Sequence, residues 1–312
     1  MRCRSMETLA RIFVAAALLV VSVSCTAQAR WQQWRAAHAP GIGRQVDPAR
    51  LPPGITILRD VRYGDDAGES FDVYAPLDAH RAPVIFMVHG GGWRRGDKAA
   101  RGVVQNKVAH WVPRGFIVVS VDYPMLPDAL PLQQARDVAL ALAAAQRNAP
   151  QWGGDPDRFV LMGHSAGAHL VALISAEPAL AIAQGARPWL GTVALDSAAY
   201  DIATIMQAPH LRLYDEAFGN DRAVWAAVSP TVQLHTDIAP FLAVCSSRRA
   251  DSCRQAEAFA AKARGFGGRA KVLPEDMRHA EINGTLGEPS AYTTAVDRFL
   301  ASLDPSLATR LQ

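Results

Sequence analysis

Apolar runs alternate with amphipathic segments along most of the chain, after a short start that predicts two strands at 55–59 and 70–75. Each later apolar run predicts a buried strand, and each segment between two runs predicts a helix. The expected strands cover 83–88, 116–121, 158–162, 191–195, 240–244 and 270–273. The expected helices cover 97–112, 131–147, 166–176, 253–264 and 289–302. This alternation predicts an α/β fold with a mostly parallel sheet flanked by helices.

The stretch 200–228 interrupts the alternation of strands and helices. It carries the aromatic residues Tyr200, Tyr214, Phe218 and Trp225, whose large side chains indicate a packed excursion. The same stretch would serve as a small cap that lines a binding pocket, and the two interpretations are compatible.

The first 29 residues have the layout of a secretory signal peptide. Arginines precede an apolar stretch from Ile12 to Ser24, and Ala27-Gln28-Ala29 provides a cleavage site of the small-x-small kind. The apolar stretch is too short for a permanent membrane span. We therefore expect residues 1–29 to be removed and the protein to be periplasmic or secreted.

Two further boundaries follow from the N-terminal sequence. Cys25 would be the modified residue of a lipoprotein, but Ser22 stands where such signals usually carry Leu or Val, so cleavage after Ala29 is the preferred interpretation. Residues 30–54, which contain Pro and Gly, are expected to form an arm or linker. Residues 55–312 are expected to form one large α/β domain.

Charge and motifs exclude several functional classes. The chain of 312 residues has 32 Lys and Arg against 29 Asp and Glu, a formal net charge of +3. This near balance argues against a nucleic-acid partner. Walker, dinucleotide-binding and metal-binding motifs are absent from the sequence, so we expect no cofactor and no metal. The expected partner is a small molecule.

Cysteine positions agree with export. Cys3 and Cys25 belong to the segment expected to be removed, which leaves Cys245 and Cys253. Disulfides persist in exported proteins, so these two cysteines are predicted to form a bridge. The alternative is a pair of free buried thiols. A zinc site is not expected, because no further Cys or His cluster completes four ligands.

Residues 163–167, Gly-His-Ser-Ala-Gly, follow a predicted strand and precede a predicted helix. In that context the pattern Gly-x-Ser-x-Gly is a nucleophile elbow. Gly163 and Gly167 leave room for a sharp turn, from which Ser165 would protrude. Its hydroxyl would lie near a helix N-terminus, where backbone N–H groups can stabilise developing negative charge.

A second motif, His89-Gly90-Gly91-Gly92-Trp93, follows the predicted strand at 83–88. A glycine-rich loop at this place supplies part of an oxyanion hole, and the residue after the nucleophile supplies the rest. The expected donors are the N–H groups of Gly91, Gly92 and Ala166. The side chain of His89 is expected to play a structural role within its own loop.

With these motifs the chain resembles the α/β-hydrolase superfamily, in particular the esterases related to hormone-sensitive lipases, feruloyl-esterase-like proteins and kynurenine formamidases. The resemblance covers roughly residues 55–303, and Pro124 departs from the Arg that is common after the Asp-Tyr of the fourth strand. It rests on Val88–Trp93, Val121-Asp122-Tyr123, Gly153–Arg158, Gly163–His169 and Ser229-Pro230. It implies the α/β-hydrolase fold, with a mostly parallel eight-stranded sheet and a small cap.

The resemblance also implies a base and an acid for Ser165, in the chain order Ser, acid, His. It places the base at His279, in the loop after the strand at 270–273. A neutral imidazole can accept the serine proton and return it to a leaving group. His210 and His235 are weaker candidates, because they fall in the cap and before a strand. His164 and His169 are expected to pack locally.

The acid is expected in the loop after the strand at 240–244, where the family places its Asp. Asp251 is the only carboxylate in that loop. It would fix the imidazole tautomer and stabilise the imidazolium, and the predicted disulfide would hold it in place. A helix cap is the alternative role for Asp251. Asp196 and Asp276 remain rival candidates for the acid.

The sequence therefore predicts a serine hydrolase that cleaves carboxylic esters through a Ser-His-Asp triad and an acyl-enzyme. A formamidase or amidase with the same triad is the nearest alternative. A catalytically silent binding protein on the same fold is a third possibility, because fold alone does not establish activity.

Overall fold

The computed structural model describes residues 45–312. The predicted signal peptide at 1–29, with Cys25, lies outside these residues. Residues 30–44 of the predicted arm also lie outside them. Within the described part of the chain, no helix combines the length and apolar character that crossing a membrane requires.

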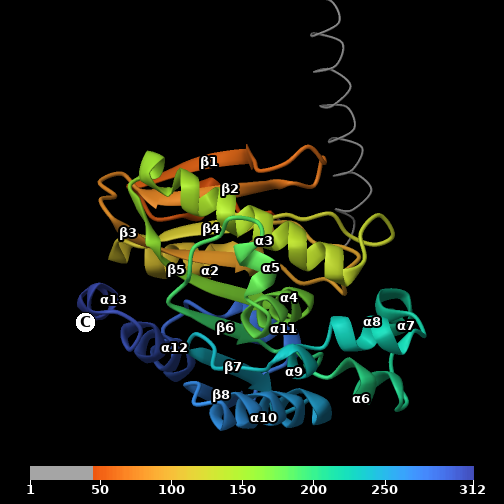
Figure 1. The fold of residues 1–312 in the computed structure, drawn as a ribbon. Coiled ribbons are helices and arrows are strands. Elements are labelled where there is room, and N and C mark those ends of the chain that lie inside the picture. Colours follow the sequence, from red (N-terminus) through yellow and green to blue (C-terminus); the bar gives the residue numbers. More distant parts are fainter. Residues whose placement is uncertain (1–44) are drawn as a thin grey trace, which may run out of the picture.

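An eight-stranded sheet forms the centre of the molecule, with the strand order β1-β2-β4-β3-β5-β6-β7-β8 (Figure 1). The first two strands pair antiparallel, β2 also runs antiparallel to β4, and the remaining neighbours are parallel. The strands are β1 (Ile55–Arg62), β2 (Ser70–Pro76), β3 (Ala82–Val88), β4 (Ile117–Val121), β5 (Gly154–His164), β6 (Gly191–Leu195), β7 (Phe241–Ser246) and β8 (Ala270–Glu275). The predicted mostly parallel eight-stranded sheet is confirmed.

Helices cover both faces of the sheet, because its inner strands are apolar on both sides. Along β5, Phe159 and Leu161 contact one hydrophobic cluster, while Val160 and Met162 contact the other. The first face carries α3 (Pro131–Asn148), α4 (Ala166–Ala176), α5 (Ala179–Ile182) and α10 (Ala250–Gly265). The second face carries α2 (Arg101–Trp111), α11 (His279–Gly284), α12 (Ala291–Ala301) and α13 (Pro305–Arg310).

Four short helices separate β6 from β7, in and just after the stretch predicted as a cap. They are α6 (Ile202–Met206), α7 (Arg212–Phe218), α8 (Arg222–Ala227) and α9 (Pro230–Gln233). The first three lie together beyond one end of the sheet (Figure 1). Phe218 and Trp225 are buried there as part of the first cluster, and Tyr214 stacks on Phe218. Tyr200 packs elsewhere, against Phe241 and Phe259.

The segment 277–284 differs from its prediction, because the structure has α11 where the sequence pattern indicates a loop. Glu281 closes the first turn: its carboxylate accepts a 2.7 Å hydrogen bond from the backbone N–H of Arg278. A helix of six residues is too short to show the helical spacing on which prediction depends. His279 is the first residue of this helix.

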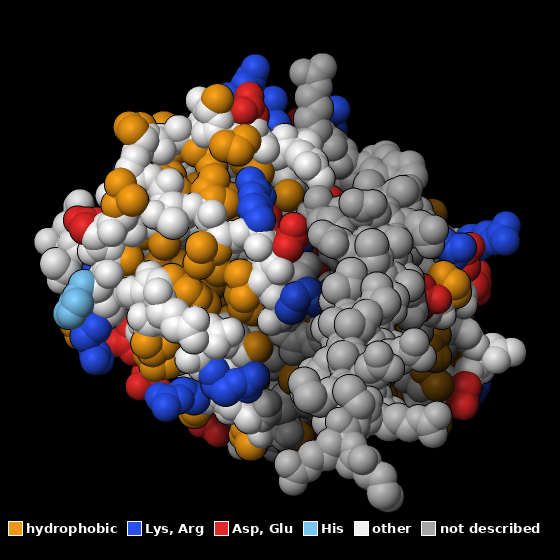
Figure 2. All heavy atoms as spheres, turned by 90° about the horizontal axis from the view of Figure 1, so that it is seen from above, with side chains coloured by type: hydrophobic (Ala, Val, Ile, Leu, Met, Phe, Trp, Pro, Cys, Tyr) orange, Lys and Arg blue, Asp and Glu red, His pale blue; other side chains and the backbone are white. Residues whose placement is uncertain are grey.

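The surface seen from above the view of Figure 1 carries charges of both signs, with hydrophobic side chains exposed between them (Figure 2). Basic and acidic side chains are interspersed on this face. The mixture agrees with the near balance of charge in the sequence.

Candidate active site

Ser165 lies in a strained turn between β5 and α4. Its φ of 55° and ψ of −116° fall in a region that residues with a side chain rarely adopt. The two flanking glycines make the turn possible, because a methyl group on Gly163 would lie 2.3 Å from the carbonyl oxygen of Gly167, and one on Gly167 would lie 2.3 Å from that of Val88. The predicted elbow is therefore present.

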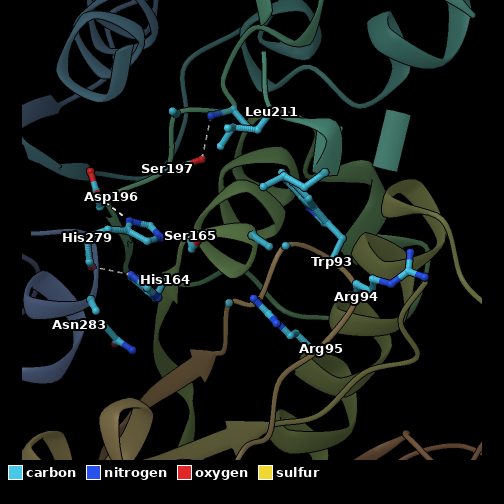
Figure 3. A pocket seen from close by; sticks show the side chains of 18 of the residues that line it. Trp93, Arg94, Arg95, His164, Ser165, Asp196, Ser197, Leu211, His279 and Asn283 are labelled. Atoms are coloured by element: carbon cyan, nitrogen blue, oxygen red, sulfur yellow. Dashed lines mark hydrogen bonds and ion pairs between the residues drawn. The ribbon is translucent and has the colours of Figure 1, made fainter. Parts of the chain in front are cut away.

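Three side chains from distant parts of the chain form one line of hydrogen bonds (Figure 3). The Oγ of Ser165 lies 2.9 Å from Nε2 of His279, and Nδ1 of His279 lies 2.6 Å from Oδ2 of Asp196. The carboxylate accepts the Nδ1 proton, which leaves Nε2 free to accept the proton of the serine hydroxyl. The end of β5, the end of β6 and the start of α11 bring these residues together.

The prediction that Asp251 is the acid partner of His279 is wrong. Asp251 lies in the first turn of α10, its side chain is 63% exposed, and its carboxylate pairs with Arg254. The rival Asp276 is also exposed and pairs with Arg248. The carboxylate that meets the imidazole is that of Asp196, which follows β6 directly. The prediction failed because α10 begins at Ala250. Asp251 therefore lies on a helix and not in a loop that could reach His279.

Asp196 is fully buried and hydrogen-bonded at both oxygens. Oδ1 accepts from the backbone N–H of Ser246 at 2.8 Å and from the hydroxyl of Ser252, and Oδ2 accepts from Arg249 at 2.7 Å as well as from His279. Burial opposes ionisation, but the hydrogen bonds from His279 and Ser252 and the charge of Arg249 outweigh it and hold the pKa of the Asp196 carboxyl well below its usual range.

Three of the four groups that donate to Asp196 come from one short segment. Cys245 and Cys253 are joined by a disulfide across a Cα–Cα distance of 5.1 Å, and Ser246, Arg249 and Ser252 lie between them. The segment predicted to contain the acid therefore contains its hydrogen-bond donors. These three residues were missed, and a serine-rich segment with two arginines carries no pattern that would have indicated them.

The glycine-rich loop at 90–93, predicted to supply oxyanion donors, lies beside Ser165. Gly91 and Gly92 have φ of 125° and 63°, and a methyl group on Gly91 would lie 1.7 Å from the carbonyl oxygen of Arg95. Both glycines line the same cavity as Ser165 and Ala166. Ala166 is the first residue of α4, where the backbone N–H has no acceptor within the helix. The structure thus brings the residues that carry the predicted donors into one cavity with the serine.

His89 supports this loop from below. Its Nδ1 donates to the carbonyl oxygen of Gly90 at 2.8 Å, and its ring stacks on Tyr123 with centroids 4.6 Å apart. Nε2 lies 3.3 Å from a carboxylate oxygen of Asp122, which also binds the buried Lys98. Burial opposes ionisation of Asp122, but Lys98 and His89 outweigh it and lower its pKa. These contacts agree with the structural role expected for His89.

The two histidines that flank the elbow make local contacts. His164 donates from Nε2 to the carbonyl oxygen of His279 at 3.0 Å, and the two rings lie 4.5 Å apart. His169 accepts from the indole N–H of Trp93 and donates to Val228 at 2.7 Å. Burial lowers the pKa of His164 to about 3 and that of His169 to about 4, so both rings stay neutral and serve as fixed hydrogen-bonding groups.

The other two candidate bases lie elsewhere. His210 is on the cap, where Nε2 lies 3.0 Å from Asp215. His235 is exposed before β7. Only His279 of these histidines is hydrogen-bonded to Ser165, so the structure agrees with its selection over His210 and His235.

A cavity of about 720 Å³ opens above Ser165. One wall is apolar: Trp93 from the glycine-rich loop stands with Leu211, Leu213 and Tyr214 from the start of α7. Arg94, Arg95 and Arg249 also line the cavity. Asn283 stands near His164 (Figure 3). Within residues 45–312, no group of His, Cys, Asp and Glu side chains is arranged to hold a metal ion.

Comparisons with known proteins find esterases among the proteins that this chain resembles. A sequence model of the BD-FAE family matches residues 71–184. Probable isoprenylcysteine alpha-carbonyl methylesterase ICME of Oryza sativa is 34% identical over 130 residues, which are 41% of this chain and 31% of that protein. Esterase LipC of Mycobacterium tuberculosis is 35% identical over 137 residues, 40% of this chain and 33% of that protein. The matched part thus spans about a third of these relatives.

Solved structures extend the likeness to most of the chain. Esterase B from Lactobacillus Rhamnosis superposes with a TM-score of 0.66 at 20% identity, over 93% of this chain and 96% of that one. Esterase 2 of Thermogutta terrifontis gives 0.65 at 20% identity, over 82% and 97%. The sheet order, the elbow and the glycine-rich loop agree with this fold. The chain has the α/β-hydrolase fold, and the relatives named here carry esterase names.

Proposed function

We propose that the protein is a carboxylic ester hydrolase in which Ser165, His279 and Asp196 act as a catalytic triad. The observation that carries this proposal is the continuous line of hydrogen bonds from Ser165 through His279 to Asp196, beside a glycine-rich loop that lines the same cavity. A hydroxyl, a neutral imidazole and a buried carboxylate in this order are the parts that acyl transfer requires.

In the first half of the reaction, Oγ of Ser165 attacks the carbonyl carbon of the ester while Nε2 of His279 takes the hydroxyl proton. Asp196 holds the imidazole by its Nδ1 proton and stabilises the imidazolium that forms. The N–H groups of Gly91, Gly92 and Ala166 donate to the oxyanion. The imidazolium then gives its proton to the alkoxide, the ester C–O bond breaks, and an acyl-serine remains.

In the second half, water attacks the acyl-serine. His279 takes one proton from the water, and the same backbone donors hold the second oxyanion. The imidazolium returns its proton to Oγ of Ser165 as the acyl–oxygen bond breaks. The products are one carboxylic acid and one alcohol, and the enzyme recovers its starting protonation state.

The apolar wall of the cavity supports a substrate with an alkyl or aryl part. Trp93, Leu211 and Tyr214 offer nonpolar surface next to Ser165, with little need for the substrate to hydrogen-bond there. A panel of aryl esters and the matching aryl formamides would distinguish an esterase from the formamidase alternative. We expect turnover of the esters, in keeping with the names of the sequence relatives.

A fluorophosphonate probe tests the proposal directly, because it forms a covalent bond only with an activated serine. We expect the wild-type protein to be labelled and the Ser165→Ala variant to remain unlabelled. Ester hydrolysis by Ser165→Ala is expected to fall by about 10⁴ or more in kcat, because triad members act as a unit. A variant that keeps a tenth of the activity would rule out Ser165 as the nucleophile.

His279→Ala, compared with His210→Ala, tests the base. We expect kcat/KM of the wild-type enzyme to rise with pH through the range in which histidine titrates. We expect His279→Ala to lose nearly as much activity as Ser165→Ala, and His210→Ala to keep wild-type activity because its imidazole lies on the cap. The opposite result would assign the base to the cap.

We further propose that the protein works outside the cytoplasm, after removal of residues 1–29. The pairing of Cys245 with Cys253 supports this, because disulfides persist in oxidising compartments. N-terminal sequencing of protein recovered from a native host tests the cleavage site. A chain that begins at Cys25 would instead indicate the lipoprotein.

A further inference from the structure

Arg249 makes an unusual contact for a residue outside the triad. Its Nη1 donates to Oδ2 of Asp196 at 2.7 Å and to the carbonyl oxygen of the same residue at 3.0 Å. The same Nη1 lies 3.0 Å from Nδ1 of His279. Two donors, one from the arginine and one from the imidazole, therefore converge on a single oxygen of the acid.

This convergence puts a permanent positive charge beside the ring that must become positive during the reaction. A guanidinium stays protonated at every pH at which proteins are active. Its charge offsets much of the negative charge of Asp196, so an imidazolium at His279 gains less from the carboxylate than it would without Arg249. The neutral imidazole is correspondingly favoured.

The remaining charged groups around His279 have other partners. His164 contacts the ring of His279 in a tilted arrangement and is neutral, because burial lowers its pKa to about 3. Lys107 on α2 donates to the carbonyl and side-chain oxygens of Asn283, at the far end of α11. Arg278 and Glu281 pair with each other on the exposed side of α11.

Lys107 is the group whose titration could overlap with that of the triad. Burial lowers its pKa to about 7, but its nearest partner is Asn283 and not His279. Tyr214 of the cap also feels Arg249 and Asp196, and burial raises the pKa of its hydroxyl above the usual value, which leaves it neutral. Lys107 and Tyr214 are present in the wild type and in any Arg249 variant. A difference between their pH profiles therefore reports the effect of Arg249.

We propose that Arg249 is a positioning residue of the triad, which holds Asp196 in place and extends ester hydrolysis toward lower pH by disfavouring the protonated form of His279. The inference rests on the proposed function, because the pH range in question is that of ester turnover. The disulfide between Cys245 and Cys253 closes the segment that carries Arg249, so the cation is held at a defined distance from the imidazole.

The test compares pH profiles of kcat/KM for Arg249→Gln, Arg249→Lys and Arg248→Gln with that of the wild type. Arg248 is the matched control, because it is the adjacent residue, carries the same charge and pairs only with the exposed Asp276. We expect Arg249→Gln to move the midpoint of the acid limb up by about one pH unit, the effect of removing a charge a few ångströms away in a partly exposed site.

Arg249→Lys keeps the charge but loses the planar fork, so we expect a midpoint between those of wild type and Arg249→Gln, with a lower plateau. Arg248→Gln is expected to leave both midpoint and plateau unchanged. An unmoved midpoint in Arg249→Gln would overturn the inference, as would an equal shift in Arg248→Gln. If Arg249→Gln does not fold, a wild-type midpoint in Arg249→Lys, together with a wild-type plateau, would overturn it.

Failure of the proposed function and failure of the role of Arg249 give different experimental results. If the proposed function is wrong, wild-type protein has no ester turnover and no phosphonate labelling. If only the role of Arg249 is wrong, wild-type protein is active and the variants share its pH profile.

Discussion

The ends of β6 and β7 carry two aspartates with opposite surroundings. Asp196 follows β6, is completely buried and accepts hydrogen bonds from His279, Arg249, Ser252 and the backbone of Ser246. Asp251 follows β7, is largely exposed, and pairs with Arg254 one helical turn away. Both residues stand after a buried strand at the same edge of a parallel sheet, where catalytic loops gather.

The difference lies in what each strand end does next. After β6 the chain turns sharply at Asp196, which has a φ of 55°. This backbone conformation is unfavourable for a residue with a side chain, and the hydrogen bonds of Asp196 stabilise it. After β7 the chain enters α10 within a few residues, and the helix carries Asp251 to its exposed side. The β7 end thus contributes donors to the acid, and the β6 end contributes the acid.

The largest effect is expected when each carboxylate is replaced by an amide in a separate variant and the two variants are compared. Asp196→Asn leaves the shape of the side chain but presents the wrong hydrogen-bond partner to the imidazole, and we expect kcat to fall on the order of 10⁴-fold. Asp251→Asn is the matched control and is expected to keep wild-type kcat. Steady-state ester hydrolysis measures both, and a large loss in Asp251→Asn would reverse the assignment.

Opening the disulfide tests whether the β7 segment acts through geometry. We expect the double variant Cys245→Ser/Cys253→Ser to lose between about 10- and 100-fold in kcat, because small displacements of positioned groups are costly. Without the bridge the unfolded chain has more conformational entropy, which lowers the free energy of unfolding by about 2.5 kcal/mol.

A core variant separates the two effects of the open disulfide. Val296→Ala, in α12 on the opposite side of the sheet, also lowers stability by removing buried apolar atoms, but it does not touch the segment between the cysteines. We expect its kcat to stay at the wild-type level. Equal kcat in the open-disulfide variant would show that the bridge acts on stability alone.

A smaller effect is expected from Ser252→Ala. Its hydroxyl donates to Oδ1 of Asp196, and that oxygen keeps the backbone N–H of Ser246 as a second donor. We expect kcat to fall by about 10-fold, which corresponds to the low end of the roughly 1.5–3 kcal/mol that a hydrogen bond to a charged group contributes. Ser247→Ala is the control, because Ser247 is exposed and its hydroxyl donates to the backbone carbonyl oxygen of Glu275 and not to Asp196. A comparable loss in Ser247→Ala would indicate a general effect of the segment.

The smallest effect concerns stability in acid. The pKa of Asp196 is lower in the folded than in the unfolded protein, so its contribution to stability is present above about pH 4 and is lost as pH falls toward the folded-state value. We expect Asp196→Asn to unfold with less dependence on pH below about 4, and Asp251→Asn to match wild type. Thermal melts across this range measure the slope, and identical slopes in all three proteins would contradict the expectation.

The sequence alone was enough for the fold and for half of the site. Buried strands such as β3 and β5 are continuous apolar runs, which leave a local signal. The elbow around Ser165 and the loop around Gly91 are local as well, because each depends on glycines at fixed spacing to avoid clashes with nearby backbone. The choice of His279 followed from chain order and resemblance.

Tertiary structure decided the acid. Asp196 and Asp251 both stand after apolar runs, and no local pattern separates a carboxylate that turns inward from one that faces solvent. The decision came from contacts between residues about 80 and 50 positions apart, His279 and Ser246 with Asp196, which sequence spacing does not encode. The role of Arg249 also depends on tertiary structure. Its charge acts on His279 through their distance in space, which the sequence does not give.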